Sequence, residues 1–170
     1  MSERLTDNEY LAIGKYVKDN KINKPIIILG DFNTNLNGVS QDKINQPSSN
    51  EYPELKAFTK LNLQDSWLEK YNNIGGFTED TRINLMRWNV KFEEKKYRID
   101  GIFYTKNKLK TNQIKIMGDK PIDIDENMQK SFYDIRIPNI PNKDKLIRKN
   151  NKLQLWASDH FAVMAELEFI

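Results

Sequence analysis

Three short polar motifs carry the side chains that could bind a ligand or transfer a proton, and each adjoins an apolar, strand-like run. They are Gly30-Asp31-Phe32-Asn33, a segment containing Arg98 and Asp100, and Ser158-Asp159-His160. Residues two apart on a strand point to the same face, so Asp31 and Asn33 are expected to converge on one ligand. Asp100 falls mid-strand among aliphatic residues, where an unpaired carboxylate is costly. It therefore needs a donor such as histidine, arginine or backbone amides.

Each motif also has a plain structural interpretation. An isolated Gly-Asp-x-Asn is typical of an Asx turn that ends a strand, and a single Ser-Asp-His is typical of a helix cap or a turn. His160 is the only histidine of the chain. The occurrence of three such motifs, each next to an apolar strand, favours a functional site over three unrelated turns.

The apolar runs around the motifs predict the strands that position them. Residues 25–29 form a continuous apolar run after Pro25, which indicates a strand covered on both faces, with Phe32 turned into packing. Residues 97–104 and 109–117 alternate between apolar and polar side chains and predict two further strands. A last strand is expected over residues 161–169, with its odd-numbered residues facing the core.

Helices are expected before and between these strands. A capping-box pattern at residues 6–9 predicts a helix that ends near Asp19 and packs through a stripe of Tyr10, Ile13 and Val17, which Leu11 widens. Another helix start lies at Glu51, and residues 63–68 begin a short helix or turn. No repeat or linker divides the chain, so we expect one domain over residues 1–170.

The composition sets outer limits on the chemistry. A chain of 170 residues is long enough for one buried core. The absence of cysteine excludes a disulfide, a thiolate metal site and a cysteine nucleophile. The net charge of +3 is compatible with a phosphate-bearing substrate. The amino terminus has no apolar signal region and no run reaches transmembrane length, so we expect a cytoplasmic protein without a membrane span.

In order, spacing and strand context, the three motifs resemble the carboxyl-terminal half of an endonuclease/exonuclease/phosphatase domain, the DNase I-like superfamily. The loop Phe77-Thr78-Glu79-Asp80-Thr81, Asn84 and the Arg98-x-Asp100 strand are similar to the 5′-tyrosyl-DNA phosphodiesterase branch, which has a tryptophan where this chain has Glu79. The resemblance implies an α+β fold, an α/β sandwich. The chain would form half of a four-layer arrangement, with a mixed, mostly antiparallel sheet and flanking helices.

The resemblance also implies a phosphoesterase, nuclease-like, that needs Mg²⁺ (or Mn²⁺) and hydrolyses a phosphodiester or phosphomonoester. Asp31 would orient and deprotonate the attacking water, Asn33 would donate to the phosphate, and Asp100 would hold the tautomer of a protonated His160. Asp159 and Asp31 would bind the metal. The residues expected to contact the substrate are Asn33, Asn84 and Arg98. Within this class, a sphingomyelinase-like or inositol-phosphate phosphatase-like activity stays open.

Three features of the complete domain have no counterpart in this sequence: an asparagine on the first strand, a metal-binding glutamate, and a second histidine upstream of the Gly-Asp-x-Asn strand. The resemblance therefore implies a half-domain with exposed apolar surface. Its expected partners are a phosphate-ester or nucleic-acid substrate and either a missing amino-terminal half or a second copy of the chain. The alternative is a catalytically inactive remnant that binds a partner or nucleic acid.

Overall fold

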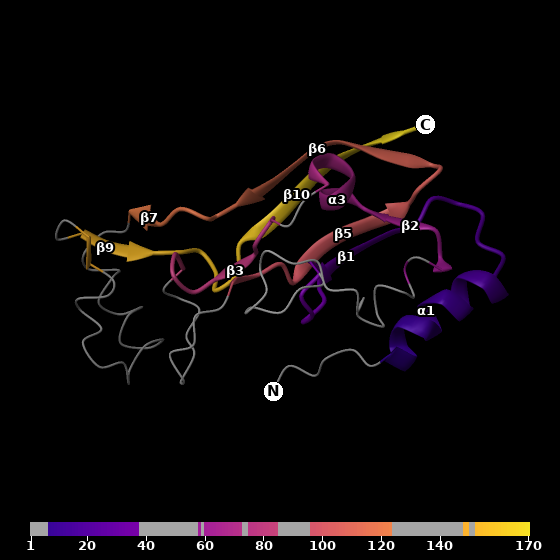
Figure 1. Ribbon diagram of the computed structural model, residues 1–170, viewed down its shortest axis with the longest axis horizontal. Coiled ribbons are helices and arrows are strands. Elements are labelled where there is room, and N and C mark those ends of the chain that lie inside the picture. The colour runs from indigo at the N-terminus through magenta and orange to yellow at the C-terminus, as the bar shows by residue number, and fades with distance from the viewer. Residues whose placement is uncertain are drawn as a thin grey trace.

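The computed structural model describes residues 7–37, 58, 60–72, 75–84, 96–123, 148–149 and 152–170. Every strand pair in this part of the chain is antiparallel. Helices α1 (Asp7–Asp19) and α3 (Ser66–Tyr71) lie on opposite sides of the sheet that contains β1 (Figure 1). The expected α+β class and the mostly antiparallel sheet are confirmed.

The sheet that carries the first two motifs has the strand order β1-β5-β2, formed by β1 (Ile27–Asp31), β5 (Asp100–Thr105) and β2 (Leu63–Asp65). Its register places Gly30 opposite Gly101 and Asp31 opposite Asp100. A Cβ atom on Gly101 would lie 2.5 Å from a methyl carbon of Leu36, so any larger residue there would push the Leu36 side chain away. This close approach lets the loop after β1 pack on β5 immediately beside the two aspartates.

A second pair of strands carries the third motif. Strand β10 (Ala162–Phe169) pairs along its whole length with β6 (Leu109–Met117), as the alternating sequence predicts for both strands. Helix α3 contacts β6, where the Tyr71 hydroxyl donates to the carbonyl of Ile114 at 2.9 Å. Strand β10 also lies against β5 (Figure 1), which brings His160 toward the sheet of β1.

Shorter strands complete the described architecture. Strand β3 (Glu79–Asp80) pairs with β4 (Lys96–Tyr97) near the start of β5. Strands β7 (Ile122–Asp123), β9 (Lys152–Leu155) and β8 (Arg148–Lys149) form a small sheet at the end of the molecule away from α1 (Figure 1).

The buried core lies under β1 and β5 and is largely aromatic. Phe32 packs edge-on against Phe58 and Phe103, with ring centroids 5.6 and 5.3 Å apart, and Leu36 completes the cluster. Ile28 of β1 packs against it from the strand. The prediction that Phe32 turns into packing is therefore confirmed, and the cluster anchors the carboxyl end of β1 where Asp31 lies.

The prediction that residues 25–29 are buried on both faces is wrong. Ile27 is 48% exposed and Leu29 is 68% exposed, whereas Ile28 contacts the core. By strand alternation Ile27 and Leu29 share the face of Asp31, and α3 and β10 cover the neighbouring β5 rather than β1. No described strand pairs with the second edge of β1. The expectation of exposed apolar surface is confirmed at this strip.

Other expectations are corrected in detail. Helix α1 ends at Asp19 as predicted, but Leu11 is exposed rather than packed. The expected strand 97–104 is broken between β4 and β5 at Arg98, whose side chain is buried by contacts given below. Residues 63–65 form the strand β2, and the expected short helix, α3, begins at Ser66. Phe169 is exposed at the end of β10. The cap at Thr6, the helix from Glu51 and most of residues 118–151 lie outside the described residues.

Candidate active site

The two aspartates of the site, Asp31 and Asp100, lie directly opposite each other in the antiparallel pair of β1 and β5. Asp31 is the last residue of β1 and is exposed, and Asp100 is the first residue of β5 and is half-buried. Carboxylates placed directly opposite each other repel, so the pair is unfavourable without a neighbouring positive charge. The fold therefore concentrates negative charge at this edge of the sheet, and a cation placed there would offset the repulsion between the two carboxylates.

His160 supplies such a charge when it is protonated, because its Nδ1 lies 3.1 Å from Oδ2 of Asp100. This hydrogen bond raises the pKa of His160 most strongly, burial opposes it, and the negative charges of Asp100, Asp159 and Asp31 raise the pKa further. With Nδ1 committed to Asp100, Nε2 is the ring nitrogen that can serve a ligand. The expectation that Asp100 has a hydrogen-bonding partner is confirmed, and the partner is histidine.

The turn that carries His160 is held by its own polar atoms. The backbone N–H of His160 donates to the Ser158 hydroxyl at 3.3 Å, and that hydroxyl donates to a carboxylate oxygen of Asp159 at 3.3 Å. Asp159 is exposed. The motif is thus both a turn, as the plain interpretation predicts, and the support of the histidine.

Asn33 follows β1 in a left-handed conformation with φ of 49°, and its backbone N–H donates to Oδ1 of Asp31 at 2.7 Å. This is the Asx turn that the sequence allows. Because β1 ends at Asp31, strand alternation does not determine the direction of the Asn33 side chain. The turn instead fixes the Asp31 carboxylate by hydrogen bonding one of its oxygens.

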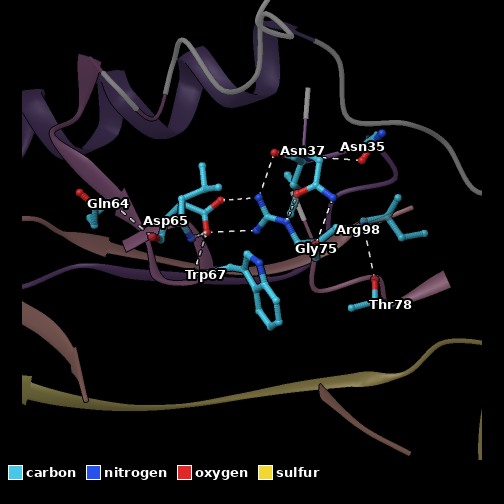
Figure 2. Close-up of polar contacts among 11 residues, drawn as sticks. Asn35, Asn37, Gln64, Asp65, Trp67, Gly75, Thr78 and Arg98 are labelled. Atoms are coloured by element: carbon cyan, nitrogen blue, oxygen red, sulfur yellow. Dashed lines mark hydrogen bonds and ion pairs between the residues drawn. The ribbon is translucent and has the colours of Figure 1, made fainter. Parts of the chain in front are cut away.

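Arg98 is 2% exposed and pairs with the carboxylate of Asp65 (Figure 2). Its Nη1 and Nη2 donate to the two Asp65 oxygens at 3.0 and 2.7 Å. Nη2 also donates to the carbonyl of Leu36 at 2.9 Å, and Nε donates to Oδ1 of Asn37 at 3.0 Å. The guanidinium is bound inside the protein, and the expected contact of Arg98 with a substrate stays a prediction.

Asn84 is fully buried, and its side-chain amide donates to the carbonyl of Ser158 at 2.8 Å. Its backbone N–H donates to the carbonyl of Asp80, also at 2.8 Å. The structure therefore places Asn84 behind the His160 turn, where it holds the backbone. Its expected contact with a substrate stays a prediction.

Sequence reasoning assigned no role to Thr78, a fully buried residue just before β3. Its hydroxyl accepts hydrogen bonds from the backbone N–H groups of Ile99 and Asp100, at 3.2 and 3.1 Å. Its carbonyl accepts from the N–H of Phe161 at 2.7 Å. The sequence signals were the density of hydrogen-bonding side chains in this loop and its resemblance to the loop of the 5′-tyrosyl-DNA phosphodiesterase branch.

The carboxylates at this edge, rather than the hydrogen-bonded imidazole of His160, suit a hard divalent cation. One ligand atom from each of Asp31, Asp100 and His160 lies within 4.8 Å of the others. Carboxylate oxygens are the ligands that Mg²⁺ and Mn²⁺ take in proteins, and Asp31 and Asp159 are exposed to receive an ion from solvent. The site thus places His160, which is hydrogen-bonded to Asp100, beside the accessible carboxylate of Asp31.

The described strands and helices are consistent with a fragment of an α+β, DNase I-like fold, and comparison with solved structures finds a similar fold. The crystal structure of D. rerio TDP2 complexed with single strand DNA product, a 5′-tyrosyl-DNA phosphodiesterase, matches 98% of this chain at 14% identity with a TM-score of 0.55. That of truncated Caenorhabditis elegans TDP2 matches 100% of it at 16% identity and a TM-score of 0.48.

The chain spans about half the length of both TDP2 structures, since the matches cover 52% and 51% of those chains. No protein-family model and no curated protein sequence matches the chain. The likeness therefore concerns the fold. In the described part of the chain, no helix is long and apolar enough to cross a membrane.

Proposed function

We propose that this chain carries part of the active site of a divalent-metal-dependent phosphoesterase. The observation that supports it best is the Asp100–His160 hydrogen bond beside Asp31, with all three ligand atoms within 4.8 Å. Phosphate-ester hydrolysis needs a group that orients and deprotonates water, and positive charge or donors at the phosphate oxygens. A free carboxylate next to a charged imidazole provides both.

Each side chain has a distinct task in this proposal. The exposed Asp31 accepts a proton from the attacking water, while the Asn33 N–H holds its other oxygen in place. Asp100 keeps the proton on Nδ1 of His160 and favours the imidazolium, whose Nε2–H then faces the anionic phosphate. The side-chain amide of Asn33 donates to a phosphate oxygen.

Asp31 and Asp159 are the residues that would hold Mg²⁺ or Mn²⁺. When bound, the ion neutralises charge on the phosphate oxygens and lowers the pKa of coordinated water. The two carboxylates are exposed at the same edge as His160, and their negative charge also contributes to its raised pKa. Loss of either carboxylate should therefore lower both the affinity for the metal and the pKa of His160.

The substrate class that we propose is a phosphodiester of the kind found in nucleic acid. The support is the fold, which matches half of a TDP2 structure that holds a single strand DNA product. We further propose that the rest of such a domain, in the same polypeptide or a separate one, covers the apolar strip of Ile27 and Leu29. That strip leads along β1 directly to Asp31, so a segment seated on it would border the site.

The test is hydrolysis of bis-p-nitrophenyl phosphate and of a 5′-tyrosyl oligonucleotide with Mg²⁺, Mn²⁺ or EDTA. We expect turnover that EDTA abolishes, and losses of at least about 100-fold in Asp31→Asn and His160→Ala. Asp119→Asn is the matched control, because Asp119 is an exposed acid outside the site. Turnover that survives His160→Ala overturns the proposal. Salt-sensitive DNA binding without turnover, alone or with a complementing half, would favour the inactive binding remnant.

A further inference from the structure

The Asp100–His160 pair joins two elements that no strand ladder connects. Among the described strands, β5 pairs with β1 and β2, whereas β10 pairs with β6. A contact of 3.1 Å between side chains on separate sheets depends on how the two backbones are fixed relative to each other. Hydrogen bonds that cross between the sheets near the pair therefore decide its geometry.

Thr78 makes such crossing bonds in both directions. On one side its hydroxyl accepts from the N–H of Asp100 at 3.1 Å and from the N–H of Ile99 at 3.2 Å (Figure 2 shows the Thr78 side chain beside this segment). On the other side its carbonyl accepts from the N–H of Phe161 at 2.7 Å. One fully buried residue thus holds the backbone of Asp100 and that of the residue after His160.

Asn84 secures the other end of the same turn. Its side chain binds the carbonyl of Ser158, two residues before His160, and its backbone N–H binds the carbonyl of Asp80 in β3. The segment from Thr78 to Asn84 consequently holds the His160 turn at Ser158 and at Phe161. The segment is itself attached to β4, through the bond from the Thr78 N–H to the Tyr97 carbonyl at 2.9 Å.

We infer that Thr78 is a positioning residue that sets the distance and orientation of His160 against Asp100. It touches neither the substrate nor the reacting atoms; it acts through the two backbones that carry the pair. The significance for hydrolysis rests on the proposed function, but the positioning itself does not, because it concerns contacts within the chain.

The test uses His160 as a single spectroscopic reporter, since no other histidine gives signals in the spectrum. At one fixed pH in EDTA, the ring ¹⁵N shifts of the wild-type chain should show Nδ1 protonated with a slowly exchanging, downfield proton. Thr78→Val is nearly isosteric and removes the acceptor. It should broaden or abolish that proton signal and speed exchange of the Asp100 and Phe161 amides about 5- to 10-fold. Thr78→Ser should restore the wild-type spectrum.

Thr105→Val is the matched control. The Thr105 hydroxyl also accepts from a backbone N–H, that of Ile26 at 2.9 Å, but it lies at the far end of β5 from Asp100. This variant should speed exchange of the Ile26 amide and leave the His160 signals unchanged. Asp100→Asn is the positive control, because it removes the partner of Nδ1 itself.

A His160 spectrum in folded Thr78→Val identical to that of the wild type overturns the inference, as does an equal disturbance in Thr105→Val. If Thr78→Val does not fold, Thr78→Ala decides, because it removes the hydroxyl without placing a new methyl group. The spectra settle the positioning whether or not the chain hydrolyses a phosphate ester. Where hydrolysis is measurable, Thr78→Val should lower kcat more than it changes KM, and Thr78→Ser should recover it.

Discussion

The buried pair of Arg98 and Asp65 offers the sharpest test of what stabilises this fold. Asp65→Asn removes the negative charge and leaves the guanidinium, at 2% exposure, without a counter-ion. Breaking one partner of a buried ion pair costs about 3–5 kcal/mol. Asn caps a helix about as well as Asp, so the bonds that Asp65 accepts from Trp67 and Leu68 at the start of α3 should persist. The loss then reports on the ion pair.

The assay is urea unfolding followed by tryptophan fluorescence and circular dichroism. A cost of about 3–5 kcal/mol is a large part of the about 5–15 kcal/mol that stabilises a typical domain. At about 2–4 °C per kcal/mol for a chain of this size, Tm should fall by about 6–20 °C. Arg98→Met should destabilise similarly. The double variant should cost less than the sum of the two single changes, because neither charge is then left alone.

The control is the exposed pair of Lys110 and Glu168, whose side chains are 47% and 51% exposed with the Nζ atom 3.3 Å from the carboxylate. Lys110→Met should change the unfolding free energy by at most about 1 kcal/mol. If Asp65→Asn costs no more than Lys110→Met, the argument from burial is refuted. Additive costs in the double variant would show that the two side chains act independently.

Three further predictions follow from described contacts. Asp100→Asn should bring the raised pKa of His160 back toward 6.5 in an NMR titration with EDTA, and an unchanged pKa contradicts the assignment. In the wild type, the contribution of the Asp100–His160 pair to the unfolding free energy is full below pH 6.5 and is lost as the pH rises through the raised pKa. Burial, and then the Glu69 hydrogen bond, raise the pKa of Tyr104 to about 12, so stability should decline from pH 10 to about 12, and Glu69→Gln should lower the pH at which the tyrosinate absorbance appears. Leu29→Lys should reduce concentration-dependent association in light scattering without lowering Tm, and association that persists would place the contact elsewhere.

Local rules predicted what depends on neighbours in sequence. Alternation located residues 109–117 and 161–169 as strands, and the cost of burying a carboxylate predicted a partner for Asp100. The rest depends on contacts between distant segments. The apolar run indicates that Ile27 and Leu29 are more stable when buried, but it does not tell which other element buries them. Arg98 binds a residue 33 positions away, which no pattern in the Arg98-x-Asp100 motif encodes.

The candidate site shows the same limit. Its acids and histidine were found because their residue types are uncommon beside apolar strands. Thr78 escaped notice because threonine is ordinary, and its role arises from bonds to amides 21 and 22 residues later. The substrate contact of Asn84 is implied only by the family resemblance and stays a prediction, whereas the hydrogen bond of its buried side chain to the Ser158 carbonyl depends on a residue 74 positions away.

The separation of Asp100 and His160 by 60 residues has a consequence for biosynthesis. Strand β1 leaves the ribosome well before β5, and β10 follows later still, so the pairing of Asp31 with Asp100 and of Asp100 with His160 must wait for long loops to close. During that interval Asp31 and Asp100 meet without the imidazolium that offsets their repulsion, and the apolar strip of β1 is open to other nascent chains. The site is therefore among the last parts of the molecule to mature, and slow translation would lengthen its most vulnerable stage.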